Sequence, residues 1–141
     1  MNFGRLLVSF VSGSTVLGAP LADWNETHVF NPRWPPHAKF HNGQSMSLGV
    51  FLGFTALWLV WRKQGDQHFQ AKLSIWLAAI YWLAQASGAL YPGAAFSDPE
   101  FRSRPVQHLP GTRIPAQIGL EAVLLAMLVA AWQLTNGREK S

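Results

Sequence analysis

The sequence predicts an all-α protein, an integral-membrane four-helix bundle with two long loops on its non-cytoplasmic side. Of its 141 residues, 49% are hydrophobic and only 13% are charged, whereas a soluble domain usually carries about 25% charged residues. Four stretches approach the length of about 20 apolar residues that crosses a bilayer as a helix. The seven tryptophans fit this class, because tryptophan concentrates at membrane–water interfaces.

The first predicted helix covers residues 6–22. Arg5, the apolar run after it and the small pair Gly18-Ala19 also fit a cleaved signal peptide. We interpret the run as a membrane span, because it leads directly into a polar segment that a helix bundle can use. Several small polar residues make this span marginal: Ser9, Ser12, Ser14 and Thr15.

The other three helices are predicted at residues 40–61, 73–95 and 115–135. The second and third spans contain no charged residue, and the fourth contains one carboxyl group, that of Glu121. All four spans belong to a single domain that covers residues 1–141.

Four spans place both termini on one side of a membrane, together with the short connection between the second and third spans. Of the 11 lysines and arginines, six lie on that side and five on the other. By the positive-inside rule we expect the termini in the cytoplasm. The two long connections, residues 23–39 and 98–113, then lie on the opposite side, and such loops often carry functional residues.

Two histidines stand at the start of the second span, His37 just before it and His41 in its first residues, and a glutamine follows on the same helical face. Pro36 suits the first position of a helix, and His37, His41, Gln44 and Leu48 then follow at i, i+4, i+7 and i+11. Lipid is a poor solvent for imidazole and amide groups, so we expect this face to point into the bundle. The alternative is that the histidines lie among lipid headgroups at the interface.

Polar residues should converge at one mouth of the bundle, because the first helix ends at Asp23, near the start of the second. The fourth span adds Gln117 and Glu121, and an intramembrane carboxyl indicates function because its burial is costly. The alternative for Glu121 is a packing role through a hydrogen bond to Gln85 or Gln117. The catalytic candidates are Glu121, Asp23, Glu26, His37 and His41. The substrate-binding candidates are Trp24, Asn25, His28, Asn31, Trp34, Gln44, Tyr81, Gln85, His108 and Gln117.

We expect neither a metal nor a cofactor. The chain has no cysteine, no H-E-x-x-H or E-x-x-H motif, no glycine-rich phosphate loop and no G-x-S-x-G. A histidine metal site is the alternative, with His28, His37 and His41 joined by Asp23 or Glu26. The formal net charge of +4 is small and scattered, which argues against a nucleic-acid partner.

The segment Asn25-x-Thr27-His28, followed by Asn31-Pro32-x-Trp34-Pro35-Pro36-His37-Ala38-Lys39-Phe40-His41, resembles the signature of a mostly uncharacterised family of small four-span membrane proteins of bacteria and fungi. The overall plan is more loosely similar to emopamil-binding-type sterol isomerases and to DoxX-like bundles. The similarity to the sterol isomerases implies a membrane pocket in which histidine and carboxyl groups act on a lipophilic substrate through a carbocation.

The resulting hypothesis is a cofactor-independent enzyme that isomerises, cyclises or opens an epoxide of a lipophilic substrate of terpenoid, sterol or polyketide type. Glu121 is the expected acid, because a carboxyl in an apolar site favours its protonated form. Asp23 and Glu26 would orient a histidine or hold a water molecule, and aromatic rings would stabilise developing positive charge.

The alternative from a different class is a non-catalytic lipid-binding or accessory module of the membrane. Arg102, Arg104, Arg113 and His108 could then bind an anionic headgroup. Four small residues also offer a surface for homo-oligomer formation: Gly49, Gly53, Ala78 and Ala79.

Overall fold

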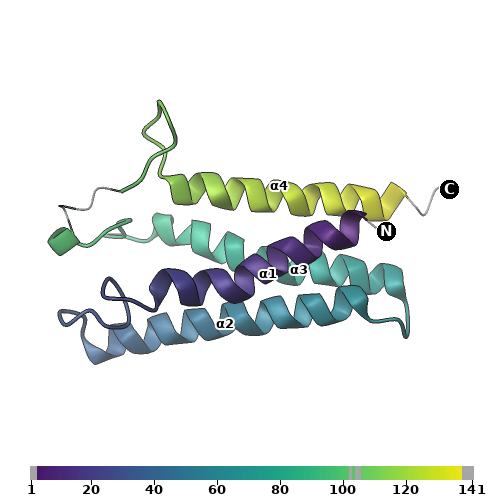
Figure 1. Ribbon diagram of the computed structural model, residues 1–141, viewed down its shortest axis with the longest axis horizontal. Coiled ribbons are helices and arrows are strands. Elements are labelled where there is room, and N and C mark those ends of the chain that lie inside the picture. The colour runs from purple at the N-terminus through teal and green to yellow at the C-terminus, as the bar shows by residue number, and fades with distance from the viewer. Residues whose placement is uncertain (1–2, 102, 104–105, 138–141) are drawn as a thin grey trace.

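A computed structural model describes residues 3–101, 103 and 106–137 (Figure 1). This part of the chain contains four long helices and no strand, which confirms the predicted all-α class. The helices are α1 (Phe3–Asp23), α2 (Pro36–Trp61), α3 (Gln67–Ser87) and α4 (Ala116–Asn136). Two short 3₁₀ helices, η1 (Gly88–Leu90) and η2 (Pro99–Phe101), lie between α3 and α4. All four long helices are long and apolar enough to cross a membrane.

Helix α3 differs most from its predicted range of residues 73–95. It begins earlier because Asp66 caps it, with a carboxylate oxygen that accepts hydrogen bonds from the backbone N–H groups of His68 and Phe69 at 2.9 and 3.0 Å. It ends earlier because Pro92 follows Tyr91, which is held in an extended conformation. Helix α2 begins at Pro36, as the proline at its first turn predicts.

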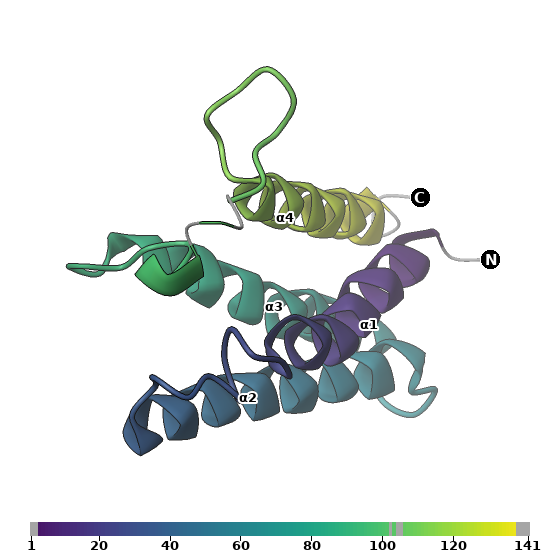
Figure 2. The same ribbon diagram turned by 60° about the vertical axis from the view of Figure 1, so that its left-hand side comes forward.

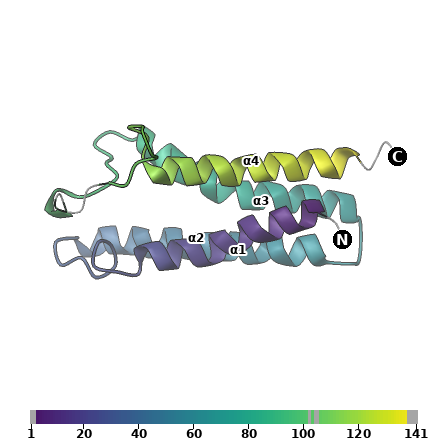
Figure 3. The same ribbon diagram turned by 45° about the horizontal axis from the view of Figure 1, so that its top comes forward.

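The helices run along the long axis of the molecule and form a ring in which α1 and α3 also touch across the middle (Figures 1 and 2). Helices α2 and α4 do not contact each other. Both ends of the described chain and the α2–α3 connection lie at one end of the bundle, whereas the two long connections lie at the other (Figure 3). The polar loops are therefore gathered at a single mouth.

The interior is built from small side chains that let the helices approach closely. A Cβ atom on Gly53 would stand 2.6 Å from Val16 Cγ2 and 2.8 Å from the Ser12 carbonyl oxygen, so only glycine fits between α1 and α2. A Cβ atom on Gly49 would likewise stand 2.7 Å from Tyr81 on α3. Ala78 and Ala79 are also buried within the chain. The four residues expected on an association surface therefore pack against neighbouring helices, and that part of the expectation is wrong.

One polar group of α1, the Thr15 hydroxyl, is paired inside the core. The Thr15 hydroxyl donates to the Val11 carbonyl at 2.9 Å and accepts from Trp82 Nε1 at 2.9 Å. Both side chains are buried. This pair links α1 to α3 through a hydrogen bond in apolar surroundings, where an unpaired polar group would be costly. The small polar residues that made the first span marginal are thus compatible with a packed helix.

The face of α2 that points into the bundle is not the predicted one. His37, His41 and Gln44 share one face, as their spacing predicts, but all three are exposed. Leu48 continues the same stripe and is exposed as well. The inward face is a heptad-like line of smaller residues, which consists of Asn42, Met46, Gly49, Gly53, Ala56 and Val60. The bundle selects this line because glycine and alanine permit close helix contact.

Large apolar side chains cover the outside of the helices. Phe10, Phe51, Trp76 and Val129, one on each helix, are all more than half exposed. At the end that holds the termini, the Arg62 guanidinium lies 4.9 Å from the centroid of the Trp58 ring. An apolar outer surface with tryptophan and basic residues at its edge is typical of a protein surrounded by lipid.

We expect Gly53→Ala to destabilise the bundle by about 1–3 kcal/mol, because the added methyl group has no space against α1. Gly43→Ala is the matched control in the same helix, since a Cβ atom there would meet nothing within 4 Å. It should stabilise α2 by up to about 1 kcal/mol through helix propensity. Thermal unfolding in detergent measures both, and equal gains in Tm would contradict the proposed close contact.

Candidate functional site

A pocket of about 640 Å³ lies at the mouth of the bundle, between α1, α3, α4 and the segment that follows α3. Its apolar wall includes Trp82, Phe96 and Leu120. Its polar wall consists of Asp23, His28, Tyr81, Gln85 and Gln117, all of which the sequence had suggested as site residues. The pocket thus combines a surface for a lipophilic molecule with a small number of polar groups.

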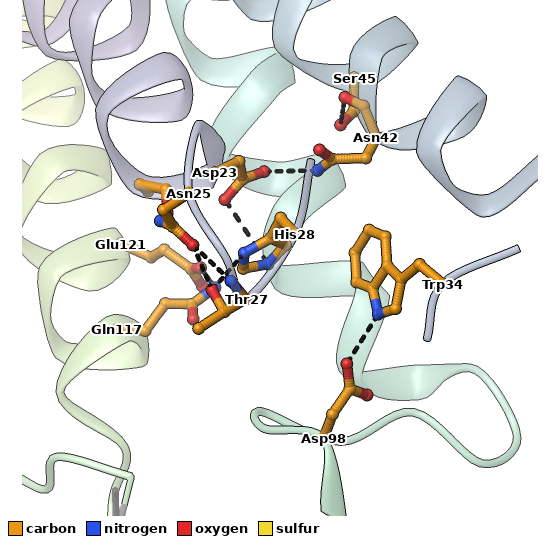
Figure 4. A network of polar contacts seen from close by, with 11 residues as sticks. Asp23, Asn25, Thr27, His28, Trp34, Asn42, Ser45, Asp98, Gln117 and Glu121 are labelled. Carbon is orange, nitrogen blue, oxygen red and sulfur yellow. Dashed lines mark hydrogen bonds and ion pairs between the residues drawn. The ribbon is translucent and has the colours of Figure 1, made fainter. Parts of the chain in front are cut away.

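A chain of hydrogen bonds orients His28 toward this pocket (Figure 4). The Asn25 amide nitrogen donates to the Ala22 carbonyl at the end of α1, which leaves Asn25 Oδ1 to accept from Thr27. The Thr27 hydroxyl donates to that oxygen at 2.6 Å and lies 2.7 Å from His28 Nδ1. Since the only hydroxyl hydrogen of Thr27 is used for Asn25, His28 Nδ1 must be the donor in the second contact.

The other ring nitrogen of His28 faces Asp23. The distance from His28 Nε2 to Asp23 Oδ1 is 3.6 Å, and Asp23 Oδ2 accepts from the Asn42 amide at 2.7 Å. Asp23 therefore faces the ring nitrogen that does not contact Thr27. Asn42 comes from α2, so three segments of the chain position this pair.

Glu121 stands on α4, one turn after Gln117 (Figure 4). It is only 2% exposed, and its Oε1 accepts from Gln117 Nε2 at 3.2 Å. Within the described part of the chain, Glu121 Oε2 has no hydrogen-bond partner, and neither does the buried Oε1 of Gln85. A native protein rarely leaves such atoms unpaired. Gln85 lines the pocket, and Glu121 follows Leu120, which lines it too. A molecule bound there could therefore donate a hydrogen bond to Gln85 Oε1.

The two long loops are joined to each other over the mouth of the bundle. Trp34 Nε1 donates to Asp98 Oδ2 at 2.8 Å, and the edge of Trp34 also meets the His28 ring at a centroid distance of 5.2 Å. Asn31 is 1% exposed and donates to Glu100 Oε1 at 3.1 Å. The hydrogen bond from Asn31, more than the nearby charge of Arg33, holds the pKa of Glu100 below its ordinary value. We call these contacts of Asn31, Arg33 and Trp34 with Asp98 and Glu100 the loop clamp.

Other predicted site residues lie away from the pocket. His37, His41 and Gln44 are exposed on the outer face of α2, and Glu26 is exposed in the loop after α1. Trp24 is 64% exposed and borders a separate apolar groove of about 290 Å³ between α1 and α2.

The residues predicted to bind an anionic headgroup also lie away from the pocket. His108 is exposed in the turn before α4, where it forms an isolated bridge with Pro115. Arg113 is exposed in the same turn, and Arg102 and Arg104 lie outside the described residues.

The predicted alternative of a metal site required His28 to join His37 and His41. Among the described residues, no group of three or more histidine, aspartate or glutamate side chains could hold a metal ion together. Two residues that the sequence interpretation missed complete the site instead: Asn42, which fixes Asp23, and Thr27, which fixes His28. The heptad line that starts at Asn42 was the available signal for the first of them.

Comparison with known proteins gives one match. The model of a family described as a family of unknown function, DUF6640, matches residues 7–130 of the chain. No curated protein and no solved structure matches the chain. The match covers α2 and α3 completely, α1 from residue 7 and α4 up to residue 130, together with the polar mouth.

Acidification should loosen the loop clamp. Because the pKa of Glu100 is lower in the folded chain than its ordinary 4.5, its carboxylate stabilises the fold above that value, and the stabilisation is lost as the pH falls through the lowered pKa. We expect Glu100→Ala to lower Tm clearly at about pH 6 and much less at about pH 2–3. Glu100→Gln, which keeps the acceptor for Asn31, should lower Tm less. If Glu100→Ala lowers Tm by the same amount at both pH values, the proposed role of the Glu100 carboxylate in the loop clamp is contradicted.

The direction of the hydrogen bond from His28 can be measured directly. Nitrogen-15 NMR of the protein in detergent micelles should show a proton on His28 Nδ1, because the Thr27 hydroxyl can only accept there. Thr27→Val removes the acceptor and should release this preference, whereas Thr27→Ser should retain it. A neutral His28 ring with its proton on Nε2 in the unaltered protein would show that the chain of hydrogen bonds runs differently.

Proposed function

The chain belongs to the family of unknown function DUF6640, and we propose that it is a small integral-membrane enzyme that performs acid–base chemistry on a lipophilic substrate without a cofactor. The observation that carries this proposal is the unpartnered Oε2 of the buried Glu121 beside a pocket that also holds the Asp23–His28 pair. Two proton-carrying groups at one apolar pocket are what acid–base catalysis requires.

Glu121 is the proposed acid. Its Oε1 accepts a hydrogen bond from Gln117, so the proton of a neutral carboxyl resides on Oε2, the oxygen without a hydrogen-bond partner within the described residues. Burial disfavours an unpaired carboxylate, and among the described residues no lysine or arginine lines the pocket to pair with it. The acid can therefore deliver its proton to a substrate alkene or epoxide.

The Asp23–His28 pair is the proposed base. The neutral ring of His28 keeps its hydrogen on Nδ1, which donates to Thr27, so the lone pair on Nε2 can accept a proton. The nearby Asp23 carboxylate then stabilises the positive ring that results. In an isomerisation, the proton that Glu121 adds to one carbon is balanced by the proton that His28 removes from another. In an epoxide opening, His28 would instead deprotonate the attacking water. Neither reaction consumes a nicotinamide, a flavin or a metal.

The pocket lining is suited to positive charge that develops in such a reaction. Tyr81 and Trp82 meet edge to face with ring centroids 5.3 Å apart, and Phe96 lines the same pocket. Aromatic faces attract cations. The cation that forms when an alkene or epoxide is protonated would be stabilised here.

We also propose that the four helices cross the membrane with the termini in the cytoplasm, which follows from six basic residues against five of the 11. The pocket then opens at the non-cytoplasmic face.

The second candidate function is a non-catalytic lipid-binding module. The apolar groove beside Trp24, which also includes Met46, Val50 and Phe51, favours it because such a groove fits an acyl chain.

Substitution of the proposed acid distinguishes the two functions. Glu121→Gln keeps size and hydrogen bonding but removes the transferable proton, so the rate should fall about 10²–10⁴-fold. Turnover can be followed in the source organism, with the variant in place of the native chain. Mass spectrometry of lipid extracts should show a substrate that accumulates, with a product of equal mass or one water heavier.

Glu100→Gln is the matched control, because it makes the same change in the loop clamp, and it should leave turnover unaffected. Cells that carry Asp23→Asn or His28→Gln should accumulate the same substrate as cells that carry Glu121→Gln. If Glu121→Gln is fully active while Asp23→Asn is inactive, the acid lies at the Asp23 side. If all three variants leave the extracts unchanged, the lipid-binding function replaces the enzymatic one.

A further inference from the structure

The histidine pair at the start of α2 is a second polar group, which the proposed function does not use. His37 and His41 lie one turn apart, and both are exposed. Their Nε2 atoms are 3.0 Å apart, and their ring centroids are 4.4 Å apart with the ring planes at 80°. The two nitrogen atoms therefore face each other across the helix surface rather than pointing independently into solvent.

Hydrogen bonding determines which nitrogen atoms carry lone pairs. His41 Nδ1 lies 3.2 Å from Gln44 Oε1, and a carbonyl oxygen only accepts, so His41 Nδ1 carries a hydrogen. In the neutral ring, His41 Nε2 then presents its lone pair toward His37. The hydrogen between the two rings must belong to His37 Nε2. Metal-binding histidines are oriented in the same way, by a carbonyl or carboxylate that accepts from the ring nitrogen that does not bind the metal.

The two nitrogen atoms are near enough to bind one metal ion together. The observed 3.0 Å is the length of the hydrogen bond between the rings. With metal–nitrogen bonds of about 2.0–2.1 Å, two ligands at 90° are about 2.9 Å apart and tetrahedral ligands about 3.3 Å apart, so the rings need to move only slightly to bind a metal at a right angle. Right-angled coordination by nitrogen is typical of Cu²⁺ and Ni²⁺. In the general order of divalent-metal affinities, Cu²⁺ binds imidazole more tightly than Ni²⁺ does.

We propose that His37 and His41 form a surface chelate for Cu²⁺ at the mouth of the bundle. On binding, Cu²⁺ takes the lone pair of His41 Nε2, and His37 exchanges its hydrogen through solvent from Nε2 to Nδ1, so that both rings stay neutral and two copper–nitrogen bonds replace one hydrogen bond. The helix holds both rings on one face, and Phe40 stacks against His37 with the planes at 8°. No third histidine or carboxylate ligand gathers here among the described residues, so water fills the remaining positions.

The test is a titration of purified protein with Cu²⁺ in detergent, on a chain that carries no oligohistidine tag. We expect one tight equivalent per chain and an electron paramagnetic resonance spectrum of a tetragonal site with two nitrogen ligands. His37→Gln and His41→Gln should each remove this equivalent. Gln44→Leu removes the acceptor that orients His41 and should weaken affinity about 10-fold or more. His108→Gln, at an exposed histidine in a different loop, should leave the titration unchanged.

Two results would overturn the proposal. If one Cu²⁺ ion per chain still binds tightly to both His37→Gln and His41→Gln, the pair does not hold the metal. If this binding is lost in His28→Gln instead, the ion binds in the pocket. Folding of each variant is checked by its Tm, and because these side chains are exposed the substitutions should leave Tm within about 1 °C.

Discussion

Direct contact between α2 and the backbone of α1 at Gly53 sets the geometry on which the site depends. A side chain at this position would collide with Ser12 and Val16, so the two helices can lie this close only because none is present. Close packing along the whole pair brings the first turns of α2 beside the last turn of α1. Asn42 can then reach Asp23, which in turn meets His28. The wall of the pocket is thus a consequence of helix contact about three turns away.

Several buried polar groups of the bundle are paired with one another. Thr15 and Trp82 satisfy each other in the core, and Asn31 is bound by Glu100 in the loop clamp. Glu121 and Gln85, in contrast, each keep one buried oxygen without a partner in the described part of the chain. Ser12 Oγ in the core also has no partner in the described part of the chain, so what distinguishes these two oxygens is their place: Gln85 lines the pocket, and Glu121 follows Leu120, which lines it too. Because an unpaired buried polar atom has an energetic cost, these are the atoms that the proposed function uses.

The fold was predictable from the sequence because the length and apolarity of four segments determine it, and helix α4 begins and ends within one residue of its predicted range. The site was predictable only in part. Asp23, His28 and Gln117 reach the pocket because they stand at helix ends that the topology brings together. The orientation of α2 was not predictable from polarity, because the position of small residues, and not of histidines, decides which face packs. Sequence spacing alone could not show that Thr27 directs the tautomer of His28, since that depends on the loop conformation.

The start of α2 shows how neighbouring residues can serve two separate purposes. Successive residues on a helix are rotated by about 100°, so His41 and Asn42 point in different directions. Asn42 lies on the inward line and holds Asp23, while His41 lies on the outward stripe with His37. A polar stretch before a membrane span therefore need not form a single site. Here the inward residue shapes the pocket, and the outward pair is free to bind a different ligand without altering it.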